Sequence, residues 1–257
     1  MNKLAVLILT KNEEKNLAET IRSVKGFATE VVVIDSGSTD RTVEIAKSLG
    51  ARVAVRPWDN DFSAQRNFAL EQTDAPWVLF LDADERPSAE LARSIARVAE
   101  ESALDKQYRL QRRTVAFGTT FKHGVLKPDS VLRLFPRKAV HWVNKVHEQP
   151  VCELPESGLP GYLEHHTYGS WADWERKLCL YTTIWAQDAY AKGKRTSIAS
   201  AVTHSFGGFF KMLVLRLGFL DGPMGACVCL THFFYVLLKY LKLVELQQQG
   251  EKAAKGR

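Results

Sequence analysis

Four short apolar runs alternate with segments of helical periodicity over the first hundred residues. The runs are Leu4–Leu9, Val31–Ile34, Val53–Val55 and Trp77–Leu81. Uninterrupted apolar runs of this length are typical of strands that are buried on both faces of a sheet. In the first intervening segment, Leu17, Ile21 and Val24 recur at helical spacing. This order predicts a parallel sheet with helices on both faces.

Capping residues predict where several of these helices begin and end. Asn16 and Asp40 are candidate N-caps, and Gly50 is a candidate for the position just beyond a helix C-terminus. A further helix is predicted over Phe62–Glu71.

The pattern changes at about residue 108. Two β-like pieces, Tyr108–Val115 and Val131–Phe135, alternate with loops rich in Arg, Lys, His and Gly. We interpret this region as an antiparallel addition that could cover a ligand site on the preceding sheet. From Trp171 onward the chain is predicted to be helical. The expected fold class is therefore α/β, with a mixed, mainly parallel sheet in residues 1–170 and a helical extension in residues 171–257.

Three polar clusters follow predicted strands at the points where the strands end. They are Thr10–Glu13, Asp35–Gly37 and Asp82–Asp84. Ligands of open α/β sheets bind outside the carboxyl ends of the strands, so the clusters predict one site at one edge. Gly37 would let the backbone approach a ligand closely. Two carboxylates at a strand end suit Mg²⁺ or Mn²⁺, although turn chemistry also explains Asp residues there.

Four motifs together resemble family 2 of the inverting glycosyltransferases, which have the GT-A fold. The motifs are Thr10–Glu14, Asp35–Asp40, Gln65–Asn67 and Leu81–Glu85, and the resemblance extends over at least residues 3–150. Within the family, the chain is most similar to bacterial lipopolysaccharide-core β-1,4-glucosyltransferases. That resemblance implies a UDP-glucose donor, a divalent metal cofactor and an inner-core heptose acceptor.

The resemblance also implies roles for individual residues. Asp84 would bind the metal directly, and Asp82 would lie nearer the ribose or the donor sugar. The residues implied to line the nucleotide pocket are Thr10, Asn12, Glu13, Asp35 and Arg66.

Inverting transfer needs a general base that takes the proton of the acceptor hydroxyl. The family places a carboxylate in the segment around residues 146–148, so this role is carried over to Glu148. We prefer Glu148 to His147 as the base, because a carboxylate is ionised at neutral pH without special tuning. His147 and Arg133 are instead candidates for acceptor contact. Of the adjacent pair His165 and His166, His166 is predicted to complete the metal or pyrophosphate site.

The charge balance is basic, with a net charge of +6. Cations between Arg109 and Lys145 are expected to hold phosphates of a lipopolysaccharide acceptor, since Arg and Lys favour phosphate. Nucleic acid is not an expected partner, because only the net charge would favour it.

The segment Phe209–Leu246 is unusually apolar and is broken by Asp221-Gly222-Pro223. Its longest uncharged stretch, Gly222–Leu238, is short for a membrane span. A basic helix lying on the membrane surface is favoured over one that packs on the catalytic domain or on a second subunit. The N-terminus has no signal-peptide pattern. The expected location is therefore cytoplasmic, peripheral on the inner membrane.

Other functions fit the sequence less well. A sugar nucleotidyltransferase would need a Gly-rich, basic loop after the first strand, and a dehydrogenase would need Gly-x-Gly-x-x-Gly. A family 2 transferase acting on another surface glycan or on a protein remains an alternative. So does a membrane-attached module that binds nucleotide without turnover.

Overall fold

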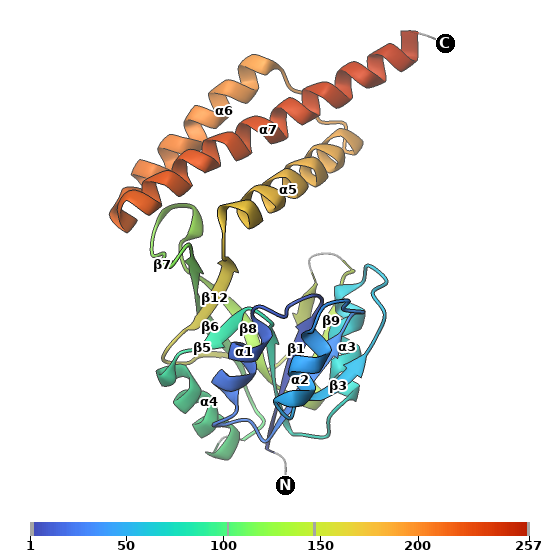
Figure 1. Cartoon of the computed structure of the whole chain (residues 1–257), viewed down its shortest axis with the longest axis vertical. Coiled ribbons are helices and arrows are strands. Elements are labelled where there is room, and N and C mark those ends of the chain that lie inside the picture. The colour runs from blue at the N-terminus through green and yellow to red at the C-terminus, as the bar shows by residue number, and fades with distance from the viewer. Residues whose placement is uncertain (1–2, 102, 146–147, 256–257) are drawn as a thin grey trace. The chain divides into compact units, whose positions relative to one another are not determined.

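The computed structural model describes residues 3–101, 103–145 and 148–255 (Figure 1). The chain divides into two compact units. The first comprises residues 1–113 and 129–166, and the second comprises residues 114–128 and 167–257. The domain boundary between residues 170 and 171 stays a prediction.

The predicted parallel strands form one half of the sheet in the first unit. They are β1 (Leu4–Thr10), β2 (Glu30–Asp35), β3 (Arg52–Val55) and β4 (Trp77–Asp82), in the order β3-β2-β1-β4. The helices between and after them are α1 (Leu17–Val24), α2 (Thr42–Ser48), α3 (Phe62–Glu71) and α4 (Ala89–Glu101). In this register Thr10 pairs with Asp35, and Leu9 pairs with Asp82. The three polar clusters therefore meet at the carboxyl edge of the sheet.

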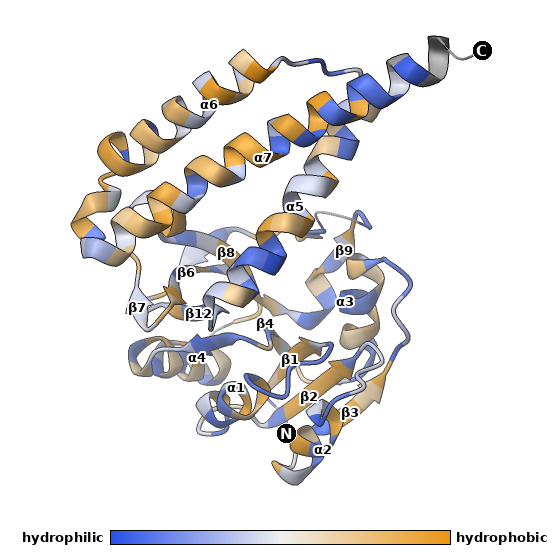
Figure 2. Cartoon of the chain, turned by 45° about the horizontal axis from the view of Figure 1, so that its top comes forward, coloured by the Kyte–Doolittle hydropathy of each residue, from blue (hydrophilic) through white to orange (hydrophobic). Residues whose placement is uncertain are grey.

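Alternation along β1 explains why helices cover both faces. Leu4, Val6 and Ile8 belong to one apolar cluster, together with residues of α1 and α4. Ala5 and Leu7 belong to a second cluster, on the side of α3. Successive strand side chains point to opposite faces, so an uninterrupted apolar run supplies two cores at once. In Figure 2 these central strands are strongly hydrophobic.

Antiparallel strands complete the sheet beyond β4. Strand β8 (Asp129–Pro136) pairs with β4, and β6 (Gln107–Ala116) pairs with β8. Strand β12 (Leu163–Tyr168) follows and pairs with the short β5 (Glu85–Pro87). The remaining pieces are β7 (Thr119–Thr120), β9 (His141–Val143), β10 (Gln149–Val151), β11 (Glu156–Gly158), and the 3₁₀ turns η1 (Gly124–Leu126) and η2 (Arg137–Ala139). The predicted α/β fold, a mixed sheet with flanking helices and a C-terminal helical extension, is confirmed.

The predicted helix ends are reproduced to within two residues. Helix α3 has the predicted range, and Asp61 caps it by accepting a 2.9 Å hydrogen bond from the backbone N–H of Ala64. Asp40 accepts the backbone N–H of Thr42, the first residue of α2. Asn16 occupies the N-cap of α1 without a side-chain capping bond. Gly50 follows α2 with φ +74°, which is the left-handed conformation that glycine adopts freely.

The second unit is mostly helical. Its long helices are α5 (Trp171–Ala191), α6 (Ile198–Phe210) and α7 (Gly222–Lys255), with π-helical η3 (Lys211–Leu215) and 3₁₀ η4 (Gly218–Asp221) between the last two. The predicted break at Asp221-Gly222 is present, and Gly222 has φ +71°. Asp221 also accepts the backbone N–H groups of Lys122 and His123, at 3.0 and 2.8 Å. The 114–128 segment is thereby bound to the turn that precedes α7.

Candidate active site

A cavity of about 360 Å³ lies at the carboxyl edge of the parallel strands. Side chains from the ends of β1 and β4, from α3 and from the segment before β10 line it. Six residues predicted from the sequence share this lining: Thr10, Glu13, Arg66, Asp82, Asp84 and Glu148. The volume is within the range of pockets that hold small ligands and cofactors.

Asp35 holds its own loop together below this cavity. Its carboxylate is buried and accepts the backbone N–H groups of Gly37 and Ser38, both at 3.0 Å. It also accepts the hydroxyl of Ser38 at 2.5 Å and that of Thr10 at 3.5 Å. Gly37 has φ +89°, so the tight turn requires a residue without a side chain. Neither Asp35 nor Gly37 lines the cavity, whereas the neighbouring Ser36 does.

Asn12 joins the loop after β1 to the loop after β2. Its side-chain oxygen accepts the backbone N–H of Thr39 at 2.8 Å, and its own N–H donates to the hydroxyl of Ser38 at 2.9 Å. Asn12 adopts φ +57°, a conformation that Asn tolerates better than most residues. Like Asp35, it is not among the residues that line the cavity. Both residues therefore shape the loops that follow β1 and β2.

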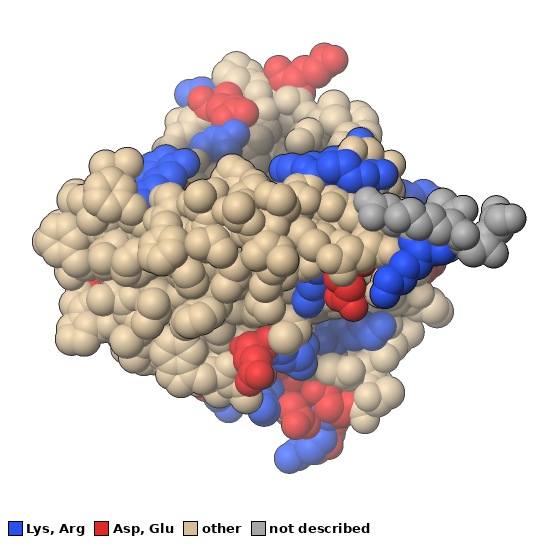
Figure 3. Space-filling view, turned by 90° about the horizontal axis from the view of Figure 1, so that it is seen from above, with Lys and Arg blue, Asp and Glu red and all other residues tan. Residues whose placement is uncertain are grey.

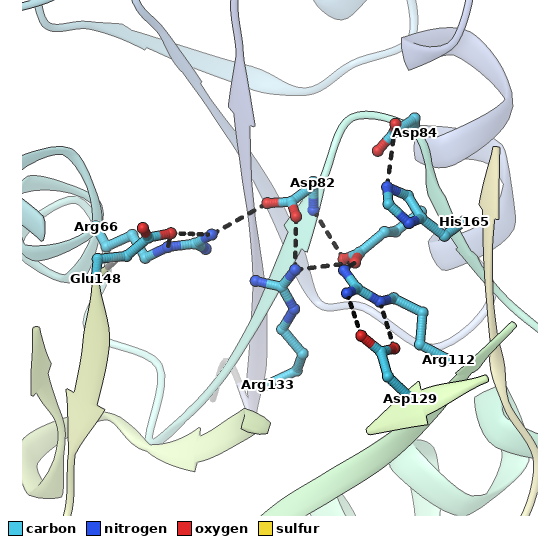
Figure 4. Close-up of polar contacts among 9 residues, drawn as sticks. Arg66, Asp82, Asp84, Arg112, Asp129, Arg133, Glu148 and His165 are labelled. Atoms are coloured by element: carbon cyan, nitrogen blue, oxygen red, sulfur yellow. Dashed lines mark hydrogen bonds and ion pairs between the residues drawn. The ribbon is translucent and has the colours of Figure 1, made fainter. Parts of the chain in front are cut away.

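Arg66 lies between two carboxylates of the cavity (Figure 4). Its Nη2 donates to Asp82 Oδ1 at 3.1 Å, and its Nε and Nη2 both donate to Glu148 Oε1 at 3.2 Å. The guanidinium is buried, with 5% of the side chain exposed, and lies 4.6 Å from the ring centroid of Trp142. Arg66 therefore fixes the relative positions of the strand-end carboxylate and the predicted base.

An alternating network of acids and arginines extends from Asp82 away from Arg66. Arg133 Nη2 donates to Asp82 Oδ2 at 2.6 Å and to Glu85 Oε1 at 2.9 Å. Glu85 is fully buried and also accepts from Arg112 at 3.0 Å. Arg112 in turn makes a two-pronged pair with Asp129, at 2.9 and 2.7 Å. Burying these charges is tolerable only because every member has an opposite partner.

This network keeps Asp82 ionised. Partial burial of the carboxyl would raise its pKa, but the charges of Arg133 and Arg66 outweigh that effect and hold the pKa well below its usual range. With Oδ1 and Oδ2 each accepting from an arginine, Asp82 is engaged as an ion-pair partner in this structure. Asp84 is then the strand-end carboxylate better placed to receive a cation.

His165, rather than the predicted His166, faces Asp84. His165 Nε2 lies 3.4 Å from Asp84 Oδ2, whereas the ring of His166 lies 3.3 Å from Glu164. The two histidines are successive residues of β12, so their side chains point to opposite faces of the sheet. Burial alone would lower the pKa of His165, but its hydrogen bond to Asp84 and the charges of Asp84 and Glu85 raise it. His166 contacts Asp84 through its backbone, donating its N–H to the Asp84 carbonyl at 2.9 Å.

The residues around Asp84 can be tested for their fit to a divalent cation. Within residues 3–101, 103–145 and 148–255, no group of three or more His, Cys, Asp or Glu side chains is placed to hold a metal ion. Mg²⁺ and Mn²⁺ often take only one or two protein ligands and share their other positions with phosphate oxygens and water. Asp84 and His165 could supply two such protein ligands.

The two predicted acceptor residues have different outcomes. His147 lies outside the described residues. Arg133 is buried between Asp82 and Glu85, and it lines a second cavity of about 280 Å³. This cavity shares Arg66, Asp82 and Glu148 with the first, and Arg112 and Trp142 also line it.

Lys11, Ser36 and Gln65 also line the first cavity, and each lies within a motif singled out in the sequence without a role of its own. Trp58 and Phe62 line it as well, and sequence reasoning did not place them at the site. Trp58 and Phe62 pack edge to face with ring centroids 4.5 Å apart, and Phe62 is 43% exposed. Their position after β3, at the same sheet edge as the polar clusters, is the signal that could have found them.

Comparison with known proteins assigns the family. Residues 5–125 match the family model described as "Glycosyl transferase family 2". An uncharacterized glycosyltransferase of Rickettsia typhi is 31% identical over 258 residues, which cover 96% of this chain and 88% of that protein. The chain belongs to glycosyltransferase family 2. The enzyme is also 30% identical to an uncharacterized glycosyltransferase of Rickettsia prowazekii, with 98% of this chain and 90% of the relative covered.

Solved structures with similarity to the transferase are more distant. S. aureus TarS has a TM-score of 0.46 and 18% identity, over 72% of this chain and 40% of that chain. Glucosyl-3-phosphoglycerate synthase from Mycobacterium tuberculosis, in complex with Mn²⁺, UDP and glucosyl-3-phosphoglycerate, has a TM-score of 0.40 and 21% identity. That match covers 54% of this chain and 58% of the synthase.

Proposed function

We propose that the transferase moves glucose from UDP-glucose to a heptose of a lipopolysaccharide inner core, with inversion at the anomeric carbon. The observation that carries this proposal is that Asp84 and Glu148 line the same cavity while Arg66 ties Glu148 to Asp82. One cavity thus offers a carboxylate for the diphosphate end of a donor and a second for the acceptor hydroxyl. The choice of uridine, glucose and heptose comes from the motif resemblance.

The donor would lie with its diphosphate toward the end of β4. Asp84 and His165 would hold the divalent cation, which would neutralise the charge that builds on the leaving diphosphate. Thr10, Glu13 and Ser36 would line the nucleoside part of the cavity, with Trp58 and Phe62 offering ring surface to the base.

Glu148 would act on the opposite side of the anomeric carbon. The acceptor hydroxyl oxygen forms the new bond to that carbon while the bond to the UDP oxygen breaks. The hydroxyl proton passes to Glu148 as this happens. Both contacts with Arg66 engage Oε1, so Oε2 takes no part in that pair. One oxygen would thus orient the base and the other would receive the proton.

The acceptor would enter through the second cavity. Arg66, Arg112 and Arg133 line it beside Glu148. Each is already paired with a carboxylate, and a phosphate or carboxylate group of the acceptor would compete for these guanidinium groups. A phosphorylated inner core has that chemistry. A lipid-borne acceptor would also place the enzyme at the cytoplasmic face of the inner membrane, as a peripheral protein.

A thermal-shift panel of nucleotide sugars, with and without Mn²⁺ or Mg²⁺, tests the donor. The expected result is a metal-dependent rise in Tm with UDP-glucose and none with GDP- or CMP-sugars. The absence of a shift with every UDP species would overturn the donor assignment. Transfer assays with purified inner-core oligosaccharide, intact and dephosphorylated, test the acceptor. Equal rates with both oligosaccharides would contradict the proposed role of the three arginines.

A further inference from the structure

Helix α6 and the π-helical segment after it expose one apolar stripe. An apolar residue recurs at every fourth position, and each is between 38% and 61% exposed: Ile198, Val202, Phe206, Phe210 and Val214. Residues four apart lie on the same side of a helix. The adjoining side carries Ala201 and Ser205, which are buried, and Ala201 packs with Val236 and Tyr240 of α7. The helix is therefore packed along one side and left apolar along the other.

The turn between α6 and α7, residues 211–221 with the π-helical segment included, continues this surface. Leu215 is 66% exposed, and Leu217 adopts φ +55°, a strained conformation for a leucine, while 43% exposed. Further exposed apolar side chains of the turn and of α7 are Phe219, Leu220, Leu230 and Phe234. Figure 3 shows a broad face with few charged groups over this unit, and Figure 2 shows the hydrophobic character of α6 and α7.

These segments do not have the burial of core helices. Ile198–Leu215 has a mean hydropathy of 1.3, and only 11% of its residues are buried. Within Gly218–Gly250, an 18-residue window has a mean hydropathy of 1.5, with 28% of its residues buried. By length and composition both could cross a membrane. An apolar surface of this size exposed to water is unfavourable, so it marks an interaction surface.

Charge favours anionic lipid as the cover. Lys211 and Arg216 are exposed within the apolar turn, and Lys192, Lys194 and Arg195 are exposed in the connection before α6. Long cationic side chains can keep their stems among apolar groups while their charges reach lipid phosphates. A protein partner of matching shape would have to bury the two cations of the turn, which costs free energy unless each is paired.

Contacts at both ends of the α6–α7 pair oppose a crossing of the bilayer. At the turn end, Asp221 binds the backbone of Lys122 and His123, and Gly124 donates its N–H to the Arg216 carbonyl at 2.9 Å. These bonds place a polar backbone segment, residues 122–124, at this end of the pair. At the other end, Thr196 and Gln247 exchange hydrogen bonds of 2.7 and 2.9 Å. A crossing would carry one of these polar ends through the bilayer.

We propose that α6, the following turn and the exposed side of α7 form an in-plane membrane surface that inserts into one leaflet of an anionic bilayer. The stripe and the turn supply the inserted apolar groups, and Lys211 and Arg216 contact lipid phosphates. This inference sharpens the peripheral membrane association in the proposed function, and it does not depend on the identity of donor or acceptor.

Vesicle flotation with the full-length protein tests the surface. Wild type is expected to float with vesicles of phosphatidylethanolamine and phosphatidylglycerol, and more weakly with phosphatidylcholine alone. F206S/F210S and L215S/L220S are each expected to weaken binding about tenfold or more, since each variant removes two apolar side chains from the inserted surface. K211Q/R216Q is expected to remove the preference for anionic lipid.

A matched control comes from the other unit. Leu104 is 48% exposed, within the 38–61% range of the stripe, and L104S should leave vesicle binding unchanged. Unchanged binding by both double serine variants would overturn the proposal. The proposal would also be overturned if wild type did not bind anionic vesicles, for example because it forms a stable dimer in solution. Donor binding in the thermal-shift assay reports separately on the transferase proposal, so either proposal can fail alone.

Thiol labelling distinguishes an in-plane surface from a crossing hairpin. Lys122 and Lys252 are exposed near opposite ends of the helical pair. In a background without the four native cysteines, K122C and K252C are both expected to react with an impermeant maleimide added outside vesicles. Labelling of only one position until detergent is added would show a crossing and overturn the in-plane arrangement.

Discussion

Arg66 holds Glu148 through two hydrogen bonds to a single oxygen. Its Nε and Nη2 both lie 3.2 Å from Oε1, and the same Nη2 reaches Asp82 at 3.1 Å. Arg66 comes from α3, Asp82 from the end of β4 and Glu148 from just before β10. One buried guanidinium therefore links the donor side of the cavity to the proposed base. A ligand that binds Arg66 or Asp82 would therefore change the hydrogen bonds that orient the Glu148 carboxylate.

Glu148→Gln tests the base directly. The amide keeps an oxygen for Arg66 but accepts a proton poorly, so transfer should fall about 10²–10⁴-fold while UDP-glucose binding is retained. The measurements are kcat with a core acceptor and Kd for UDP-glucose by calorimetry. Near-normal turnover would remove Glu148 from the mechanism.

The parallel half of the sheet and its polar edge were predictable because local pattern determines them. The apolar runs at Leu4–Leu9 and Trp77–Leu81 are typical of doubly buried strands, and the polar residues directly after parallel strands share an edge of the sheet. Capping at Gly50 and the range of α3 followed from short-range chemistry in the same way.

Long-range side-chain partners were not predictable. Glu85 meets Arg112 and Arg133 only because β8 inserts between β4 and β6, and no spacing along the chain shows that insertion. The choice between His165 and His166 depended on which face of β12 turns toward Asp84, which is fixed by its pairing with β5. A register shifted by one residue would have reversed that choice.

The two histidines of β12 form a matched pair for testing the cation site. His165→Asn should weaken the Mn²⁺-dependent gain in UDP affinity about 10–100-fold, the usual effect of disturbing a metal site. His166→Asn should leave that gain nearly unchanged, because its ring faces Glu164. Nucleotide affinity at several Mn²⁺ concentrations distinguishes them. The reverse order of effects would support His166, as predicted from the sequence, over His165.

Gly161 tests the packing of the turn before β12 against α4, and it does not line the cavity. It has φ +93°, and a Cβ there would lie 2.3 Å from the backbone nitrogen of Leu91. Gly161→Ala should therefore lower the free energy of unfolding by at least about 1–3 kcal/mol. Gly158→Ala is the control, since it has open space around its Cβ position and no positive φ. Equal midpoints in urea for the two variants would contradict this reading of the 161 turn.

The buried and the exposed carboxylates of the acid–arginine network should contribute differently to stability. Glu85 is fully buried and binds Arg112 and Arg133, whereas Asp129 binds Arg112 with half of its side chain exposed. Removing one partner of a buried pair leaves an uncompensated charge, so Glu85→Gln should cost about 3–5 kcal/mol of unfolding free energy.

Asp129→Asn is the matched comparison and should cost only about 0–1 kcal/mol, because solvent screens an exposed pair. Urea unfolding followed by circular dichroism measures the unfolding free energy of both variants. Added salt should reduce the loss caused by Asp129→Asn more than the loss caused by Glu85→Gln. Equal losses of unfolding free energy for the two variants would show that pairing with Glu85 is not what positions Arg133 against Asp82. The ionised state of Asp82 would then need another source.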